Sequence, residues 1–340
     1  MSAFDDASRV LRDAIASRVF PAATAEVGAS EGVLWQEALG TLTFDDCSEA
    51  TSLYTPFDLA SLTKIIGTTA AVMQLVQTGR VGLDEPVASF FDEWRGADRE
   101  AVTVRDLLEH ASGLSARLTD PPGEGRREFE HDICAMELEY LPRTASIYSD
   151  LGFILLGFIV ADRGGRSLEE QIRLRADTRE SRRRAAPTIA MDEDRRRGQL
   201  LVGEVHDNYA AALGGMAGHA GLFATVSAAG DFARTVLGAA RGDPAMPPPF
   251  SPDLVRTFTT KSRVPGSSRA LGWDTMLPTS SCGTRMSPSA FGHVGFTGTS
   301  LWIDPDRDRY FVLLTNRVCG GGTIDDMRRV RRAFHDAIHG

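Results

Sequence analysis

The chain has 340 residues, of which 42% are hydrophobic and 24% are charged, and its mean hydropathy is −0.15. This composition is that of a folded globular protein and excludes a disordered or fibrous chain. The formal net charge of −9 argues against a nucleic-acid or anionic-membrane partner, because either partner requires a basic surface.

The first segment predicts where the protein resides. Residues 1–19 form an amphipathic helical pattern without the basic region and apolar core of a secretory signal. The longest apolar run, residues 151–161, falls short of the ~20 residues that cross a bilayer. The four cysteines are widely spaced and form no CxxC, which favours reduced thiols. We therefore expect a cytoplasmic protein with no membrane partner.

Strand patterns come next along the chain, followed by an apolar helix. Residues 23–30 and 32–42 alternate and contain glycines at their ends, which predicts antiparallel strands. A helix is predicted from Ser61 to Gln77, with Gly79 as its stop.

Helical periodicity dominates the middle of the chain, and strands return near its end. The clearest helices are 102–108, 151–162, 167–175 and 227–240, and the later strands are 269–276, 292–297, 299–303 and 310–315. A last helix runs from Ile324. This order predicts an α/β protein of the α+β type, with an antiparallel sheet flanked by helices. Its α/β lobe is built from 1–78 and 260–340, its inserted helical lobe is 79–259, and the active site is expected in the cleft between them.

Only two of the 37 basic residues are lysines, Lys64 and Lys261. Lys64 lies three residues after Ser61, a spacing that places both side chains on one helical face. A serine hydroxyl needs a base, and a desolvated lysine can lose its proton whereas an arginine effectively cannot. This SxxK pattern predicts Ser61 as nucleophile and a neutral Lys64 as base. The alternative is a helix N-cap at Ser61 beside a surface lysine.

The segment FDLASLTK around Ser61 resembles the first signature of the serine β-lactamase and penicillin-binding-protein superfamily. That superfamily uses SxxK, a Tyr or Ser motif ending in Asn, and KTG, in this order. Tyr148-Ser149-Asp150 resembles the second motif as used in the class C and family VIII esterase-like branch. His293-Val294-Gly295 resembles the third, with histidine in place of lysine. Similar stretches at 83–87, 103–114 and 203–223 extend the resemblance over most of the chain.

The resemblance implies a β-lactamase/transpeptidase-like fold, no cofactor, and a role for each matching residue. Tyr148 would share proton transfer with Lys64 as one coupled unit. The oxyanion hole would be formed by the backbone N–H groups of Ser61 and Phe296, the residue after Gly295. The chain has no ExxLN element to supply a separate glutamate, so deacylation is expected to reuse the tyrosine and the lysine.

Two departures from the family pattern concern the substrate. Asp150 stands where asparagine is usual, and an ionised carboxylate cannot donate to a substrate carbonyl. It is expected to hold Lys64 and favour its charged form. His293 stands where lysine is usual and is only partly charged near neutral pH, which weakens a clamp for a substrate carboxylate. Both changes favour esters over β-lactams, although some D,D-peptidases of the superfamily also place histidine there.

The other histidines, a metal site and a second serine motif are also considered as functional features. His110 is expected to be a structural hydrogen-bonding residue, and His219 to border the cleft. No metal site is predicted, because the chain lacks HExxH and paired Cys and His ligands. The GxSxG match at residues 28–32 is followed by strand-like residues, whereas a nucleophile elbow needs a helix there.

We therefore expect a serine hydrolase that forms an acyl-enzyme on Ser61 and acts on a small-molecule ester, or an amide. One alternative is a β-lactamase or D-amino-acid peptidase with the same mechanism. Another is a non-catalytic binding or sensor module on the same fold. The acyl group, the leaving group and the oligomeric state do not follow from the sequence.

Overall fold

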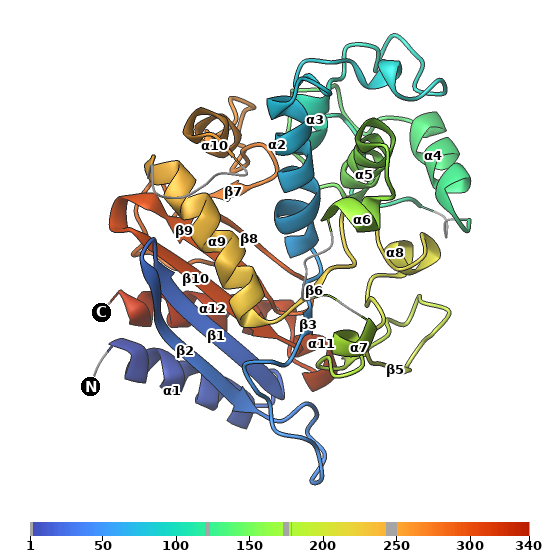
Figure 1. The fold of residues 1–340 in the computed structure, drawn as a ribbon. Helices are drawn as coiled ribbons and strands as arrows, with labels where there is room; N and C mark the ends of the chain where they lie inside the picture. The colour runs from blue at the N-terminus through green and yellow to red at the C-terminus, as the bar shows by residue number, and fades with distance from the viewer. Residues whose placement is uncertain (1–2, 120–122, 173–176, 178, 243–249, 340) are drawn as a thin grey trace.

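Figure 1 shows the fold in a computed structural model that describes residues 3–119, 123–172, 177, 179–242 and 250–339. A twisted sheet with helices on both faces forms one part of the molecule, and a group of helices forms the other (Figure 1).

The sheet has six antiparallel strands in the order β2-β1-β10-β9-β8-β7. Their bounds are β1 Ala22–Ala29, β2 Gly32–Gly40, β7 Asp274–Thr275, β8 Phe291–Val294, β9 Ser300–Asp304 and β10 Arg309–Thr315. β1 pairs with β10, with Ala23 opposite Thr315, so segments from both ends of the chain share one sheet. All eight residues of β1 are buried, because its small side chains admit helices on both faces.

Three helices cover this sheet. α1 (Ala3–Ala16) and α12 (Ile324–Ile338) pack together against one face, where Leu313 of β10 points. α9 (Val226–Arg241) packs against β1, β9 and β10 on the other face, where Val312 and Leu314 point. This alternation along β10 is the period of two that a strand between two layers requires.

The second part of the molecule is organised around α5 (Asp150–Gly164), whose residues Leu151 to Val160 are all buried. A helix that is apolar on every side must be surrounded, and α2, α3, α4 and α6 contact it. The other helices are α2 Ala70–Gln77, α3 Val104–Leu108, α4 Arg126–Ala135, α6 Leu168–Ile172, α7 Arg179–Arg182, α8 Asn208–Ala212, α10 Pro252–Thr259 and α11 Arg317–Gly320. Short elements complete the fold: a π-helical segment η1 Lys64–Thr69, 3₁₀ turns η2 Val87–Ser89 and η3 Pro305–Arg307, and the strand pairs β3 Phe57–Asp58 with β6 Phe223–Ala224 and β4 Thr188–Ile189 with β5 Leu200–Leu201.

The predicted fold class, an antiparallel sheet flanked by helices, is confirmed. Three details differ from the sequence prediction. The strand expected at 269–276 is only β7, and the helix expected from Ser61 begins as η1 after a turn that contains this serine. The helix expected at 227–240 is α9, which packs on the sheet although it was assigned to the helical lobe. An amphipathic pattern indicates that one face of a helix is buried, but it does not indicate which element that face packs against. Residues 173–175 of the helix expected at 167–175 lie outside the described residues.

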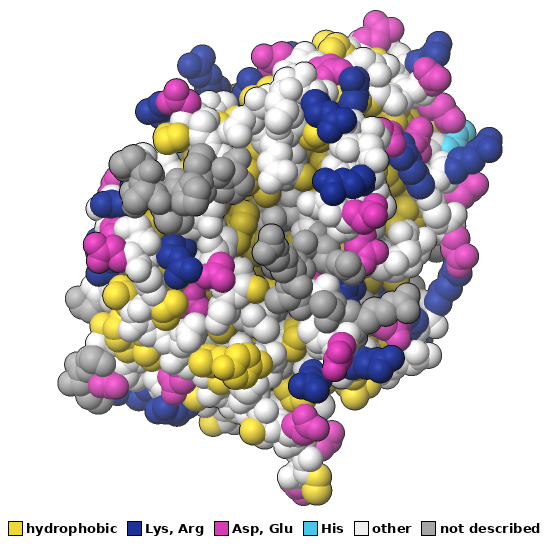
Figure 2. Space-filling view, viewed as in Figure 1, with side chains coloured by type: hydrophobic (Ala, Val, Ile, Leu, Met, Phe, Trp, Pro, Cys, Tyr) yellow, Lys and Arg dark blue, Asp and Glu magenta, His cyan; other side chains and the backbone are white. Residues whose placement is uncertain are grey.

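The surface carries both signs of charge. Basic and acidic side chains are interspersed on the face drawn in Figure 2. In the arginine-rich segment 163–198, Arg182 pairs with Asp177 at 2.5 Å and Arg196 pairs with Asp194 at 2.7 Å. Within the described ranges, the helices lack the combination of length and apolar character that crossing a membrane requires.

Candidate active site

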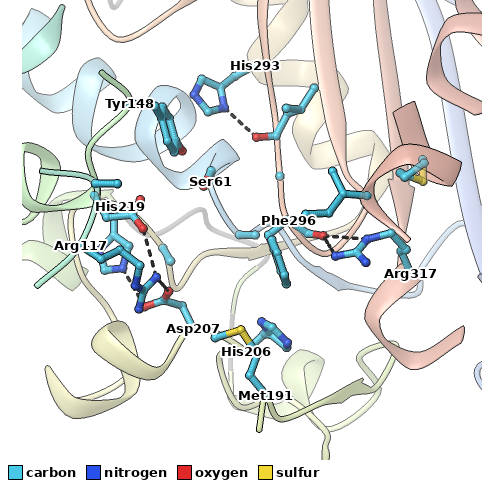
Figure 3. Close-up of a pocket in the computed structure, with 18 of the residues that line it drawn as sticks. Ser61, Arg117, Tyr148, Met191, His206, Asp207, His219, His293, Phe296 and Arg317 are labelled. Carbon is cyan, nitrogen blue, oxygen red and sulfur yellow. Dashed lines mark hydrogen bonds and ion pairs between the residues drawn. The ribbon is translucent and has the colours of Figure 1, made fainter. Parts of the chain in front are cut away.

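A pocket of about 640 Å³ lies where β8, the turn before η1 and loops of the helical part meet (Figure 3). Seven predicted site residues line it: Ser61, Tyr148, Asp150, His219, His293, Gly295 and Phe296. Lys64 lies behind this lining, with an exposed fraction of 0%. The structure thus brings together residues that are more than 200 positions apart in the chain.

Ser61 lies in a tight turn between β3 and η1. The preceding Ala60 has a φ of 47°, a left-handed conformation that costs a non-glycine residue about 1–2 kcal/mol. The buried Asp58 fixes the turn by accepting the Ala60 N–H at 2.8 Å and the His206 N–H at 2.6 Å. Lys64 Nζ lies 3.2 Å from Ser61 Oγ, so the contact that the SxxK spacing predicts is present.

Lys64 is held mainly by a carboxylate. Its Nζ donates to Asp150 Oδ1 at 2.7 Å, lies 3.5 Å from the carbonyl oxygen of His219, and is 4.6 Å from the ring centre of Tyr148. Burial lowers the pKa of Lys64, but Asp150 and Tyr148 raise it by more, so the pKa lies above its ordinary value. Lys64 is therefore a cation in the resting protein. The expectation that Asp150 holds Lys64 and favours its charged form is confirmed, whereas the neutral lysine expected from the SxxK pattern was wrong because the Asp150 carboxylate outweighs desolvation.

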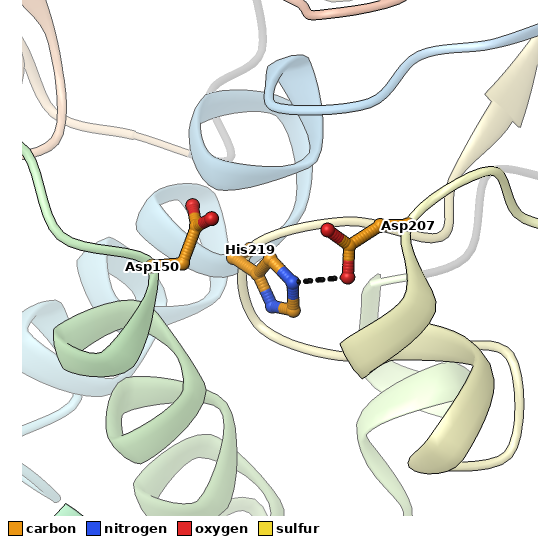
Figure 4. Close-up of side chains that lie close together, drawn as sticks. All are labelled: Asp150, Asp207 and His219. Atoms are coloured by element: carbon orange, nitrogen blue, oxygen red, sulfur yellow. Dashed lines mark hydrogen bonds and ion pairs between the residues drawn. The ribbon is translucent and has the colours of Figure 1, made fainter. Parts of the chain in front are cut away.

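Asp150 belongs to a wider ion-pair network. Arg117 Nη1 lies 3.2 Å from Asp150 Oδ2 and 3.0 Å from Asp207 Oδ2, and His219 Nε2 lies 2.7 Å from Asp207 Oδ1 (Figure 4). Burial raises the pKa of both carboxyl groups, but Lys64 beside Asp150 and His219 beside Asp207 lower it below the usual range. Both acids are therefore ionised.

The same cluster has the spacing of a metal site. One ligand atom each from Asp150, Asp207 and His219 lies within 4.8 Å of the others. However, Lys64 and Arg117 already bind the two carboxylates and neutralise their charge. We interpret the cluster as the network that positions Lys64.

Tyr148 forms the upper wall of the pocket in Figure 3. It precedes Ser149, whose hydroxyl caps α5 by accepting the Gly152 N–H at 3.3 Å. Its ring lies 4.8 Å from the ring of His110, and His110 Nδ1 accepts the Ser149 N–H at 3.1 Å. His110 is thus a hydrogen-bonding residue that fixes the segment carrying Tyr148.

His293 lies beside Tyr148, at a ring distance of 5.8 Å, and is almost fully buried. Its Nδ1 lies 2.8 Å from the carbonyl oxygen of Val294, and its Nε2 has no partner among the described residues. Burial, with the Arg269 and Lys64 cations, lowers the pKa of His293 well below its ordinary value. His293 is therefore neutral at pH 7, and the partial charge expected from sequence was wrong.

The loop from Gly295 to Thr299 is fastened to the strand that precedes the nucleophile. The hydroxyl of Thr297 donates to the carbonyl oxygen of Asp58 at 2.8 Å, and the hydroxyl of Thr299 donates to that of Leu59 at 3.0 Å. A Cβ on Gly295 would lie 2.6 Å from the Leu59 oxygen, so only glycine fits this approach.

The backbone N–H groups of Ser61 and Phe296 lie at this junction and are candidate donors for an oxyanion. Among the described residues, neither the N–H of Ser61 nor that of Phe296 has a protein acceptor. Both residues line the pocket.

On the other side of Ser61 from Tyr148, the pocket is lined by Met191 and Phe296 together with His206 and Arg317 (Figure 3). The apolar residues Ile324 and Met327 also line the pocket. The Phe296 side chain is 45% exposed and its ring lies 5.5 Å from the ring of His206.

Sequence reasoning did not single out several charged residues of the pocket: Arg117, Asp207, Arg269, Arg317 and Arg331. In a chain that uses arginine almost everywhere, the arginines carry no compositional signal. Asp207 lay within the stretch 203–223 that resembles the family, and this was its only signal.

Comparisons with known proteins agree with these observations. The family model described as Beta-lactamase matches residues 8–334. A putative D-alanyl-D-alanine carboxypeptidase of Escherichia coli (strain K12) is 28% identical over 306 residues, which cover 77% of this chain and 69% of the relative. An N-acetylmuramyl-L-alanine amidase of Bacillus subtilis (strain 168) is 29% identical over 305 residues, covering 77% and 68%.

Solved structures share the fold. EstCE1, described as a hydrolase with promiscuous acyltransferase activity, has a TM-score of 0.75 at 18% identity over 99% of this chain and 98% of that one. A penicillin-binding-protein homologue from Caulobacter crescentus has a TM-score of 0.75 at 20% identity, with the same coverage. The β-lactamase/transpeptidase-like fold expected from the motifs is confirmed.

Proposed function

Because this chain belongs to the β-lactamase family and is a serine hydrolase of that type, we propose that it forms an acyl-enzyme on Ser61 and hydrolyses small carboxylic esters. The observation that carries this proposal is the 3.2 Å contact between Ser61 Oγ and the buried Lys64 Nζ. It lies at a pocket where the N–H groups of Ser61 and Phe296 have no acceptor among the residues that the structure describes. A nucleophile, a proton-handling group and oxyanion donors are the parts that acyl transfer requires.

In the proposed first half-reaction, Ser61 Oγ attacks the ester carbonyl carbon and its proton passes to Tyr148. Tyr148 takes this proton in its phenolate form, whose negative charge the Lys64 cation stabilises before the transfer, so the two act as one coupled unit. The carbonyl oxygen becomes an oxyanion that the N–H groups of Ser61 and Phe296 bind. Collapse breaks the bond to the leaving alcohol, which takes the proton.

The second half-reaction reuses the same groups. Water attacks the acyl carbon, its proton passes to Tyr148, and the proton returns to Ser61 Oγ as the bond to the acid breaks. We propose that Asp150 keeps Lys64 charged throughout this cycle, with Arg117 holding Asp150 in turn.

Two features favour a neutral ester as the substrate. His293, which replaces the usual lysine, is neutral and offers no cation to a substrate carboxylate. The apolar lining residues of the pocket, which include Met191, Phe296, Ile324 and Met327, suit an apolar acyl or alcohol group. We propose a small molecule of this kind as the partner of the pocket.

The test is hydrolysis of p-nitrophenyl butyrate by the purified protein and by Ser61→Ala, with mass spectrometry for an acyl adduct on Ser61. We expect the wild type to turn over and Ser61→Ala to lose that turnover. Unchanged hydrolysis in Ser61→Ala would overturn the mechanism. Failure of a fluorophosphonate to label Ser61 in folded protein would instead favour the non-catalytic binding module.

A second candidate is hydrolysis of β-lactams or D-amino-acid peptides by the same mechanism, and Arg269 favours it. Its guanidinium lies 5.0 Å from the ring centre of Tyr148, and its ion pair with Asp274 is long, at 3.9 Å. The side chain is 21% exposed, so it can receive a substrate carboxylate in place of the missing lysine. The name of the E. coli relative also supports a D-alanyl substrate. Rapid turnover of nitrocefin that Arg269→Gln abolishes, with negligible ester hydrolysis, would promote this candidate over the first.

A further inference from the structure

Arg331 is a buried cation that faces peptide carbonyl groups. It lies on α12 with 6% of its surface exposed, and it has no carboxylate partner among the described residues. Its Nη2 donates to the carbonyl oxygens of Gly295 and Thr299, both at 2.7 Å. Its Nε is buried and has no partner within the described ranges, and burial lowers the pKa of the guanidinium to about 9. Burying an unpaired charge is unfavourable, so this arginine opposes folding unless its contacts compensate.

The carbonyl group of Gly295 and the N–H group of Phe296 belong to one peptide unit. Arg331 binds the oxygen of this unit, and the hydrogen of the same unit is the proposed oxyanion donor. A positive charge on a peptide oxygen draws electron density from the nitrogen and strengthens the N–H as a donor. Hydrogen bonds from charged donors are also roughly twice as strong as neutral ones.

The second hydrogen bond of Arg331, to Thr299, holds the other end of the same loop. The Thr299 carbonyl oxygen, which Arg331 also binds, accepts the Gly295 N–H at 2.8 Å. The hydroxyl of Thr299 in turn binds the Leu59 carbonyl oxygen, two residues before Ser61. The Arg331 guanidinium therefore fixes the loop that carries the Phe296 N–H. The Thr299 hydroxyl connects this loop to the turn that carries the Ser61 N–H.

The neighbouring Arg317 provides a contrast. It donates to the carbonyl oxygen of Phe296 through Nε at 3.1 Å and through Nη2 at 2.6 Å. That oxygen belongs to the next peptide unit, whose hydrogen is on Thr297. Arg317 therefore supports the loop without polarising the Phe296 N–H.

We propose that Arg331 is a positioning residue of the oxyanion hole, which orients and polarises the Gly295–Phe296 peptide so that its N–H stabilises the tetrahedral intermediate. This inference rests on the proposed hydrolase function. Arg331 touches no reacting atom, and its effect belongs to the transition state more than to substrate binding.

The experiment compares Arg331→Met and Arg331→Lys with the matched control Arg328→Met, an arginine on the same helix whose side chain is 58% exposed. For each folded variant, the kcat and KM for p-nitrophenyl butyrate are measured, together with the affinity for butylboronic acid, which forms a tetrahedral adduct with an active serine.

Arg331→Met is expected to lower kcat about 10- to 100-fold, somewhat less than the loss of an oxyanion donor itself, with KM changed less than about twofold. Boronate affinity should fall by a similar factor. Arg331→Lys restores a cation and is expected to recover kcat to within about tenfold of the wild type. Arg328→Met should behave as wild type.

A folded Arg331→Met with wild-type kcat, or with only a raised KM, would overturn the proposal. If Arg331→Met does not fold, the proposal is tested with Arg331→Lys. The proposal predicts that this variant loses kcat and boronate affinity by the same factor. A loss of kcat without a loss of boronate affinity would overturn the proposal. Absence of ester turnover and of Ser61 acylation in the wild type would remove the proposed function and this inference together. Loss of activity in Ser61→Ala with normal kcat in Arg331→Met would remove the inference alone.

Discussion

Lys64 and Asp150 form a buried ion pair, with Nζ 2.7 Å from Oδ1 and the lysine fully inaccessible to solvent. The pair places a permanent cation behind the nucleophile, where a desolvated neutral amine was expected. The charge state of this lysine is therefore set by its carboxylate partner.

Asp150→Asn should shift the pH profile of the enzyme. Asp150 raises the pKa of Lys64, so removing the carboxylate lowers that pKa, and the cation is lost at a lower pH. If the charged lysine is the active form, the alkaline limb of kcat/KM for an ester moves to lower pH by about one unit or more. Because the pKa of Lys64 in the wild type lies above its ordinary value, ester hydrolysis is measured from about pH 7 to 12 with the spontaneous rate subtracted. An alkaline limb at the same pH in both proteins would contradict the prediction.

Lys64→Arg should yield a folded and nearly inactive protein. Arginine keeps the positive charge, but its planar guanidinium does not reproduce the geometry in which the Lys64 ammonium contacts both Ser61 Oγ and Asp150 Oδ1. We expect kcat to fall by about 10²–10⁴-fold, the range for general acid–base groups. Lys261→Arg is the matched control, because Lys261 is the other lysine of the chain and is exposed. Thermal melts establish folding, and rates near those of the wild type in Lys64→Arg would refute the role.

Gly295→Ala should separate the β8–β9 loop from the nucleophile turn. The added Cβ would lie 2.6 Å from the Leu59 carbonyl oxygen, so the loop that carries the Phe296 N–H must shift. We expect at least a tenfold loss of kcat, since oxyanion donors are sensitive to position. Gly82→Ala is the control, because its Cβ would meet nothing closer than 3.5 Å. Equal kcat values for the two variants would show that the close approach has no role.

His335→Leu should stabilise the protein, most strongly in acid. His335 is fully buried beside Phe311 and Phe334, and neither ring nitrogen has a partner in the part of the chain that the structure describes. Burial lowers its pKa to about 3. Between about pH 6.5 and pH 3 the unfolded chain binds a proton that the folded chain does not, so stability falls as the pH falls.

The variant should remove a dependence of about 1.4 kcal/mol per pH unit over that window. Burial raises the pKa of Asp58 to about 6, which acts in the opposite direction, but it does so equally in both proteins. Urea denaturation at pH 4.5 and 7.5 checks the difference, with the exposed His131→Gln as control. A gain in stability that is the same at both pH values would contradict the assignment to titration.

The parts of the site that could be predicted from sequence are those whose chemistry depends on local spacing or on a motif. Ser61 and Lys64 are one helical turn apart, and the contact between them follows from that separation. Tyr148, His293 and Phe296 were located because their motifs occur in the family order. No local pattern relates Arg117 to Asp207 or Arg331 to Gly295, which are 90 and 36 residues apart in the chain.

The fold was predictable to a similar extent. Alternation identified β1 and β2 and helical periodicity identified α5 and α12, because each pattern is local. The position of α9 depended on which hydrophobic surface its buried stripe meets, and residues 226–241 carry no information about that. The charge state of His293 also depended on its burial and on Arg269, which only the tertiary structure supplies.

The pairing of β1 with β10 has a consequence for the order of events during protein synthesis. Residues 22–29 leave the ribosome early, yet one side of this strand finds its hydrogen-bonding partners only in residues 310–315. The loop of the proposed oxyanion hole likewise lacks its hydrogen bond from Arg331 until that residue has been synthesised. A nascent chain that has been synthesised as far as residue 300 therefore already contains Ser61, Lys64 and Tyr148 but still has an open strand edge, the kind of surface that associates with other chains. We expect hydrolytic activity to appear only after the last strand and α12 have been synthesised.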